Sequence, residues 1–162
     1  MSGEADAATP ADAVIQKARV LLLDQDDRAL LFYTRADVAT NPTRWLTPGG
    51  HLEASETHAV GAARELFEET GLVVPAGELG SPFYSRDFEA EPAPGIRRSY
   101  HEEWYLHRTL HFSPVDDNWT PEERVDVEQW RWFALAEIRE SADSFEPADL
   151  PEVLERVLRS AD

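Results

Sequence analysis

The 162-residue sequence contains no cysteine, and it has no apolar run as long as a membrane helix requires. Without cysteine, neither disulfides nor thiolate metal sites are available, and a reducing cytoplasm is compatible with the composition. The longest apolar stretches are the length of strands, whereas a membrane-spanning helix needs about eighteen such residues. We therefore expect a cytoplasmic protein without membrane-spanning segments.

Positive charge is also scarce, and the formal net charge is −17. The phosphate backbone of a nucleic acid, or an anionic membrane, would meet a repulsive field, which argues against general affinity for either. A small anionic substrate would need bound metal ions or well-placed arginines. Fourteen of the fifteen basic residues are arginine, whose planar guanidinium matches the geometry of phosphate.

The length suits one domain, and a hydrophobic content of 42% with five Trp, seven Phe and four Tyr argues for a folded core. Residues 1–13 are rich in Ala, Asp and Glu and lack the basic and apolar regions of a secretory signal. We expect a flexible N-terminal tail over residues 1–13 and a single domain over residues 14–162.

The segment from Gly50 to Leu72 concentrates the candidate chemistry. Before it, Thr47 to Gly50 reads Thr-Pro-Gly-Gly, which predicts a turn. Ser55 is a candidate N-cap, and Gly71 stands where a left-handed C-cap is favoured. These signals predict a helix over Glu56 to Thr70, about four turns long.

Helical periodicity divides this segment into two sides. The residues expected to pack against a core are Ala59, Ala62, Ala63, Leu66 and Thr70, flanked by Val60 and Phe67. Glu65, Glu68 and Glu69 are three or four residues apart and crowd together on the other side, which they share with Gly61.

Two interpretations of the glutamate cluster compete. It could be a solvated acidic face, partly neutralised by Arg64 paired to Glu68 at the i, i+4 spacing. It could instead be a divalent cation site, since carboxylate oxygens at this spacing suit Mg²⁺ or Mn²⁺. Gly61 favours the second interpretation, because an interior glycine costs up to about 1 kcal/mol relative to alanine but leaves room beside the carboxylates.

The segment resembles the signature box of the Nudix hydrolases. The fixed positions of that box are filled by Gly50, Glu56, Arg64, Glu65, Leu66, Glu68, Glu69, Gly71 and Leu72. Nine specified positions match within 23 residues, so a chance coincidence is negligible. The box covers about a seventh of the chain, and the elements expected around it are also similar to the family's.

The resemblance implies an α/β fold, namely an α/β/α sandwich with a mixed sheet and a loop-helix-loop catalytic motif. It implies that Glu65, Glu68 and Glu69 hold Mg²⁺, with Mn²⁺ as a substitute, assisted by a backbone carbonyl of Gly49 or Gly50. Arg64 and Glu56 look like the supporting pair that orients these ligands. The general base is expected to be Glu65 or Glu68, and the candidates outside the box are Glu102, Glu103, Glu122 and Glu123.

The function implied is divalent-metal-dependent cleavage of a phosphoanhydride bond in a nucleoside diphosphate linked to another group. A catalytically silent Nudix domain that senses a nucleotide is the alternative, although the intact glutamates argue against it. The superfamily's isoprenoid isomerases carry an active-site cysteine, which this chain lacks. No substrate subclass is assigned, and assembly into a homodimer is left open.

Elsewhere the sequence predicts further elements. Strands are expected at Gln16 to Leu23, Ala29 to Tyr33, Trp45 to Thr47, Ser99 to Leu110 and Val125 to Phe133, of which the first two form a hairpin and Ser99 to Leu110 is central. Leu72 to Pro75 reads as extended chain, residues 89–97 as a flexible loop and Asp116 to Glu123 as a loop or short helical turn. Short helices are expected at Ala134 to Glu140 and Ala148 to Arg159.

Other constellations carry weaker signals. The five histidines never form a His-Glu-x-x-His spacing, so they are interpreted as surface or packing residues rather than zinc ligands. Arg86, Arg97 and Arg98 lie near the expected flexible loop and could hold phosphates, although each alone is more typical of a surface charge.

Overall fold

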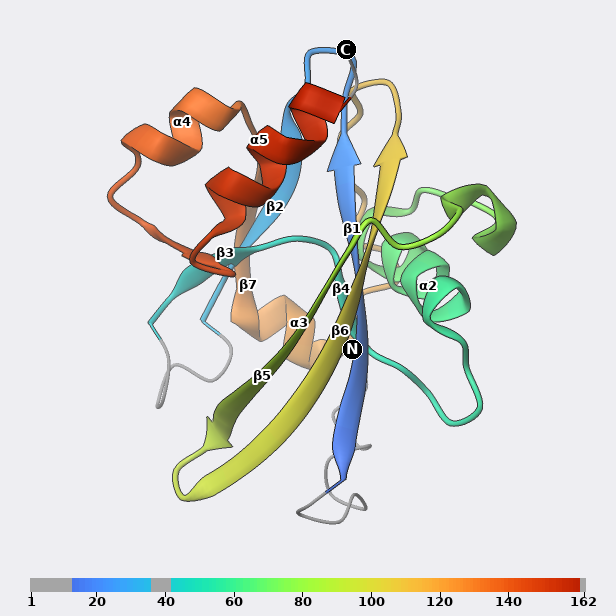
Figure 1. Ribbon diagram of the computed structural model, residues 1–162, viewed down its shortest axis with the longest axis vertical. Coiled ribbons are helices and arrows are strands. Elements are labelled where there is room, and N and C mark those ends of the chain that lie inside the picture. The colour runs from blue at the N-terminus through green and yellow to red at the C-terminus, as the bar shows by residue number, and fades with distance from the viewer. Residues whose placement is uncertain (1–12, 36–41, 161–162) are drawn as a thin grey trace.

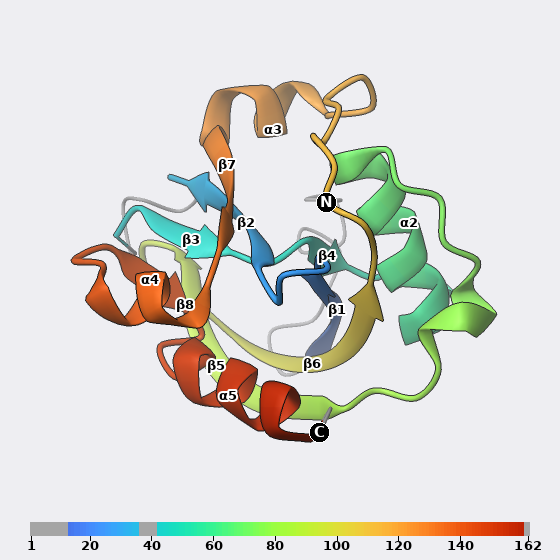
Figure 2. The same cartoon turned by 90° about the horizontal axis from the view of Figure 1, so that it is seen from above.

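The structure is a computed structural model that describes residues 13–35 and 42–160. A curled mixed β-sheet forms its centre, with helix α2 on one side and helices α4 and α5 on the other (Figures 1 and 2). This arrangement confirms the predicted α/β class. The N-terminal tail, predicted over residues 1–13, falls almost wholly outside the described residues.

The strands are β1 (Val14–Leu23), β2 (Ala29–Thr34), β3 (Arg44–Leu46), β4 (Gly49–His51), β5 (Tyr84–Ala93), β6 (Ile96–Arg108), β7 (Val127–Phe133) and β8 (Ser144–Glu146). The helices are α2 (His58–Thr70), the 3₁₀ turn η1 (Ala76–Leu79), α3 (Pro121–Asp126), α4 (Leu135–Glu140) and α5 (Leu150–Ser160). The strand order is β5-β6-β1-β2-β3-β8, with β4 paired to β1 and β7 paired to β2. In the described part of the chain, no helix combines the length and the apolar character needed to cross a bilayer.

Strand β1 connects most of the sheet. It runs parallel to β6 from Val14 opposite Ser99 to Leu23 opposite Arg108, and antiparallel to β4. Leu23 also faces Ala29 across the β1–β2 hairpin, as the sequence predicts. Because strands this central are covered on both faces, the second half of β1, Val20 to Leu23, is a continuous apolar run.

Alternating residues of β1 enter two cores. Ala18 and Leu22 pack with Leu66 of α2, whereas Leu21 packs on the opposite side with Leu154 of α5. The predicted core contact of the box helix is confirmed for Ala59, Ala62, Ala63 and Leu66, whereas the flanking Val60 and Phe67 are exposed. The sheet separates α2 from α5 as the sandwich requires.

The predicted N-cap of α2 is wrong by two residues. Thr57 is the cap, with extended backbone and a side chain that accepts a hydrogen bond from the N–H of Val60 at 3.3 Å. Ser55 instead has a positive φ of 66°, within the turn before the helix. The predicted C-cap is confirmed, since Gly71 adopts a left-handed conformation with φ of 83°.

The predicted flexible loop at residues 89–97 is also wrong. Strands β5 and β6 form an antiparallel hairpin there, and the rings of the paired residues Phe88 and Tyr100 stack at 5.1 Å between centroids. Pro92 suggested a loop, but β5 is an edge strand, where proline is tolerated because one side of the strand makes no ladder hydrogen bonds.

Smaller differences concern element ends. Gly49 and Gly50 belong to strand β4 rather than to a turn, and Val125 lies in α3 rather than in a strand. The expected central strand, β6, is second from one edge of the main strand order. Strand β7 begins at Val127, and residues 72–75 form no strand.

Candidate active site

The glutamate side of α2 faces the interior rather than water. Glu65 is completely buried and Glu69 is 8% exposed, so the interpretation of the whole cluster as a solvated acidic face does not hold. Glu68 is more accessible, with 30% of its side chain exposed. Burying carboxylates is costly unless each is paired or coordinates a cation.

Glu123 joins this cluster from a distant part of the sequence. One carboxylate oxygen from each of Glu65, Glu69 and Glu123 lies within 4.8 Å of the others, and Glu123 is 2% exposed. Helix α3 positions Glu123 through a capping box, in which its carboxylate accepts from the N–H of Thr120 at 2.9 Å and the Thr120 hydroxyl accepts in return.

The electrostatics of the cluster favour a cation. Burial raises the pKa of Glu69 well above its ordinary value, and repulsion from Glu65 and Glu123 raises it further. Three buried carboxylates offering hard oxygen donors fit a divalent ion of the Mg²⁺ or Mn²⁺ type.

Strand β4 holds Glu69 from the opposite side. The backbone N–H of Gly49 donates a hydrogen bond to Glu69 Oε1 at 3.0 Å. Gly49 has φ of 147°, and a Cβ atom there would lie 2.3 Å from the carbonyl oxygen of Ala18. Only glycine therefore allows β4 to approach β1 closely enough to make this contact.

Arg64 links the start of the box to its glutamates. Its Nε and Nη2 donate to the two carboxylate oxygens of Glu56 at 2.7 and 2.9 Å. Its Nη1 donates to Glu65 at 3.1 Å and Glu68 at 3.2 Å, and Nη2 also reaches the carbonyl of His51 at 3.0 Å. One guanidinium thus fixes the orientation of three carboxylates.

Gly61 makes room for the contact between Arg64 and Glu56 rather than for an ion. A Cβ atom at Gly61 would lie 2.2 Å from Leu52 and 3.0 Å from a carboxylate oxygen of Glu56. The glycine inside α2 therefore lets the preceding loop close over the helix and bring Glu56 to Arg64.

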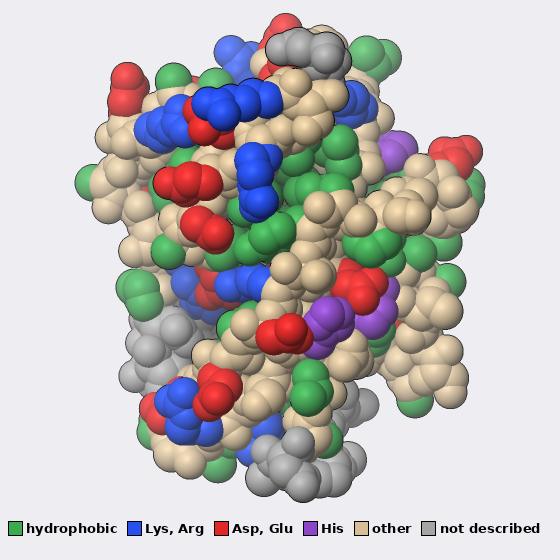
Figure 3. Space-filling model, in the orientation of Figure 1, with side chains coloured by type: hydrophobic (Ala, Val, Ile, Leu, Met, Phe, Trp, Pro, Cys, Tyr) green, Lys and Arg blue, Asp and Glu red, His purple; other side chains and the backbone are tan. Residues whose placement is uncertain are grey.

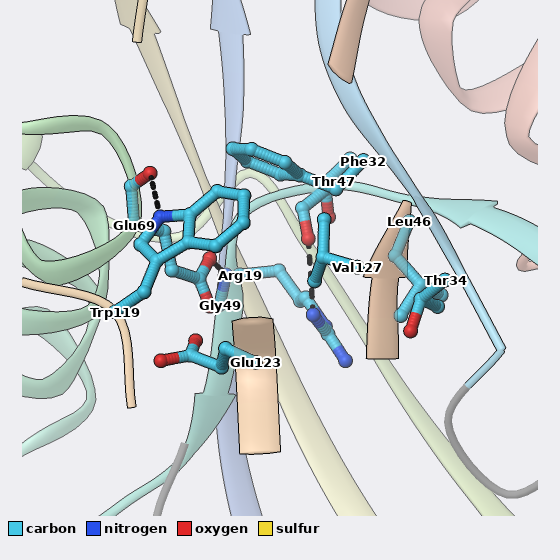
Figure 4. A pocket seen from close by; sticks show the side chains of 10 residues that line it. All are labelled: Arg19, Phe32, Thr34, Leu46, Thr47, Gly49, Glu69, Trp119, Glu123 and Val127. Carbon is cyan, nitrogen blue, oxygen red and sulfur yellow. Dashed lines mark hydrogen bonds between the residues drawn. The ribbon is translucent and has the colours of Figure 1, made fainter. Parts of the chain in front are cut away.

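A pocket opens beside Glu69 and Glu123 (Figure 4). Phe32 and Trp119 contribute aromatic surface, with their rings edge to face at 6.0 Å. The indole N–H of Trp119 donates to the carbonyl of Glu69 at 2.9 Å, which attaches the pocket wall to the acidic helix. The cluster is therefore reached from a cavity with an apolar wall.

A family model described as the NUDIX domain matches residues 15–156 of the sequence. The chain belongs to the Nudix family. This match spans nearly the whole described structure, so the resemblance inferred from the box of 23 residues holds for the domain.

Individual Nudix relatives match at moderate identity. The MutT-like protein of Streptomyces ambofaciens is 34% identical over 109 residues, which cover 63% of this chain and 67% of that protein. The human m7GpppN-mRNA hydrolase NUDT17 is 36% identical over 74 residues, or 45% of this chain, and that match spans only 23% of the human protein. The crystal structure of the MutT protein from Methanosarcina mazei Go1 covers 95% of this chain and 99% of its own with a TM-score of 0.68, at 20% identity.

Among the candidates outside the Nudix box, the structure brings Glu123 to the glutamates. Glu102 is completely buried elsewhere, where it accepts from Arg19 at 3.1 Å and Arg86 at 2.7 Å. Burial alone would raise the pKa of Glu102, but Arg19, Lys17 and Arg86 together lower it to about 2.

Two further candidates also lie apart from the cluster. Glu103 contacts His58 and His101, and Glu122 is exposed. Of the arginines considered for phosphate binding, Arg86 is committed to Glu102, and Arg97 pairs with Glu89 at 3.2 Å.

Sequence spacing could not select Glu123 from the four outside glutamates. A usable signal was nonetheless present, because Thr120, Pro121 and Glu123 form a capping-box pattern that predicts a helix start with an oriented glutamate. Trp119 carries no sequence signal of its own for the site. Its contact with the Glu69 carbonyl depends on the fold.

Proposed function

We propose that this Nudix chain is a divalent-metal-dependent hydrolase that cleaves a phosphoanhydride bond in a nucleoside diphosphate linked to another group. The observation that carries the proposal is the convergence of Glu65, Glu69 and Glu123, all buried, at the edge of a pocket. The family supports the reaction class. Divalent cations held by the cluster would neutralise the diphosphate, which the protein's net charge of −17 would otherwise repel.

We assign ion binding to Glu65, Glu68 and Glu69 of the box, with a backbone carbonyl of Gly49 or Gly50, and we add Glu123. A bound Mg²⁺ or Mn²⁺ would neutralise charge on the phosphoryl oxygens and favour ionisation of a water molecule. The Gly49 N–H that reaches Glu69 fixes the rotamer of that carboxylate.

Arg64 and Glu56 act as positioning residues in this proposal. Their bidentate contact fixes the guanidinium of Arg64, which in turn donates hydrogen bonds to Glu65 and Glu68. The general base is Glu65 or Glu68. Exposure favours Glu68, because its side chain can contact a water molecule, whereas Glu65 is completely buried. Without a bound ion, burial and then repulsion from Glu65 raise the pKa of Glu68.

The pocket has a volume of only about 20 Å³, so it would have to widen to take the nucleoside part of the substrate. Phe32 and Trp119 offer apolar ring surface next to Glu69, and nucleobases favour aromatic contacts. The anhydride would then lie toward Glu69 and Glu123, at the acidic end of the same pocket.

The proposal is tested by a hydrolysis panel with Mg²⁺ or Mn²⁺. The panel contains nucleotide sugars, dinucleoside polyphosphates, nucleoside triphosphates and, because NUDT17 is named as a cap hydrolase, a capped RNA oligonucleotide. We expect Glu69→Gln to lower turnover of the cleaved compound at least tenfold, while the exposed Glu122→Gln retains it.

Two outcomes would contradict the proposal. One is that no compound is hydrolysed, and the other is that Glu69→Gln hydrolyses as fast as the wild-type chain. Nucleotide binding without turnover would favour the alternative of a silent sensor domain. A cytoplasmic location and assembly into a homodimer stay predictions, to be checked by fractionation and by sizing in solution.

A further inference from the structure

Two histidines and a glutamate meet on the side of the sheet that faces α2. His58 is the first residue of α2, whereas His101 and Glu103 lie two residues apart on β6 and therefore on the same face of that strand. One ligand atom from each of the three lies within 4.8 Å of the others, and all three side chains are partly exposed. Figure 3 shows histidine and acidic side chains gathered on this surface.

Hydrogen bonds turn one nitrogen of each imidazole toward Glu103. Asp87, which faces His101 across the β5–β6 ladder, lies 2.7 Å from Nδ1 of His101. A carboxylate can only accept, so Nδ1 carries the proton. The other nitrogen, Nε2, lies 3.0 Å from Oε2 of Glu103, where by the same rule it donates, so binding an ion requires Nε2 to release its proton.

His58 is held in a similar way. Its Nε2 lies 2.9 Å from Oε1 of Gln16, and its Nδ1 lies 3.6 Å from Glu103. Each imidazole thus has an outer hydrogen-bond partner and an inner nitrogen directed at one carboxylate. Metal-binding histidines characteristically have such an outer partner, which fixes the tautomer and the ring orientation.

We propose that His58, His101 and Glu103 bind a borderline transition-metal ion of the Zn²⁺ class, with Asp87 and Gln16 as outer partners. Tetrahedral coordination with bonds of about 2.1 Å places ligand atoms roughly 3.4 Å apart. His101 Nε2 lies 3.0 Å from Oε2 of Glu103 and His58 Nδ1 lies 3.6 Å from Oε1, so the three side chains are already gathered at about this spacing. Water supplies the fourth ligand, since the cluster is open to solvent.

The donor set distinguishes this site from the catalytic cluster. Two imidazole nitrogens and one carboxylate favour Zn²⁺, Co²⁺ or Ni²⁺, whereas the all-carboxylate cluster of Glu65, Glu69 and Glu123 favours Mg²⁺ or Mn²⁺.

The consequence is a cross-link between distant segments. An ion held by His58 and His101 would join the first turn of α2 to strand β6, and so attach the helix that carries the glutamates to the sheet. This role needs no catalytic activity, and the proposal is independent of the proposed hydrolysis.

The test uses the full chain, stripped of metal and then supplied with excess Mg²⁺ to occupy carboxylate sites. Zn²⁺ is titrated by calorimetry, and Co²⁺ is followed by visible absorption. We expect one Zn²⁺ per chain in the wild type, Co²⁺ bands of the four-coordinate type, and a higher unfolding temperature when Zn²⁺ is present. His101→Gln should weaken Zn²⁺ binding more than tenfold and abolish the Co²⁺ bands.

His107→Gln is the matched control, because His107 lies on the same strand and face but outside the cluster. It should retain both signals. If His101→Gln fails to fold, Asp87→Asn replaces it, since Asp87 is 82% exposed and its loss should weaken Zn²⁺ binding about 10–100-fold. The proposal is overturned if the wild type binds no Zn²⁺ above excess Mg²⁺, or if the cluster variant binds as tightly as His107→Gln.

Discussion

The backbone N–H of Gly49 and the carboxylate of Glu69 are joined by a hydrogen bond of 3.0 Å, although 20 residues separate them in the sequence. Glu69 therefore depends on the position of β4, and β4 depends on glycine, because the carbonyl of Ala18 occupies the space that a Cβ atom would need. The orientation of an acidic side chain is thus set by how closely two strands approach.

Gly49→Ala should destabilise the chain by about 3 kcal/mol, because it combines a strained positive φ with a clash against the backbone of β1. The free energy of unfolding in urea measures this loss. Gly77→Ala is the control, since nothing lies within 4 Å of a Cβ atom at Gly77. Equal stability of the two variants would show that the strands can separate without cost.

Arg64→Lys should weaken Mn²⁺ binding about 10–100-fold, because an ammonium group cannot hold Glu56 with two prongs and reach Glu65 as well. Electron paramagnetic resonance of free Mn²⁺ gives the affinity directly. Arg108→Lys, in an exposed pair with Asp27, should bind Mn²⁺ like the wild type. An unchanged Mn²⁺ affinity in Arg64→Lys would remove Arg64 from the positioning role.

Glu102→Gln should destabilise the chain by about 3–5 kcal/mol, since it leaves Arg19 buried beside Arg86 without the carboxylate that both of them contact. Urea unfolding again measures the change. The exposed Glu89→Gln, which breaks a surface pair with Arg97, should change stability far less. Similar losses from the two substitutions would contradict a structural role for the buried ion pair.

Asp24 should make stability depend on pH in the acid range. Burial by itself would raise the pKa of Asp24, but hydrogen bonds from Arg28, His111 and Asp26 outweigh it and lower the pKa below the ordinary 3.8. The stabilisation is therefore complete above pH 3.8 and is lost as pH falls through the lower folded-state pKa.

Unfolding of Asp24→Asn and the wild type should be compared from pH 7 down to pH 2. The difference in stability should be largest above pH 4 and should shrink in acid. Asp117→Asn, at an exposed position, serves as the control. A difference that stays constant throughout this range would contradict the lowered pKa.

Local patterns predicted the parts of the fold whose causes are local. The β1–β2 hairpin and α2 could be predicted from the sequence, because alternation, helical periodicity and the Gly71 cap act within a few residues. The cap at Thr57 was missed because Ser55 and Thr57 are both good capping residues, and only the positive φ of Ser55 decides between them. The β5–β6 hairpin was missed because its proline and glycine content is equally typical of loops.

In the candidate site, too, contacts within one motif could be predicted from the sequence, whereas contacts between distant segments could not. The contact of Arg64 with Glu56 lies within one motif, and the resemblance predicted it. The approach of Glu123 to Glu69, and of His58 to His101, joins segments more than forty residues apart. The distances between these side chains are set by the curl of the sheet and the path of the chain around it, so they cannot be predicted from residue spacing.

The carboxylate of Glu123 takes part in two structures at once. It completes the capping box that begins α3, and it is one of the three carboxylates of the acidic cluster. Whatever binds the cluster therefore also changes the stability of the first turn of α3, and by thermodynamic reciprocity the folding of that turn changes the binding constant by the same factor. Amide hydrogen exchange in α3 would thus report occupancy of a site to which that helix contributes a single side chain.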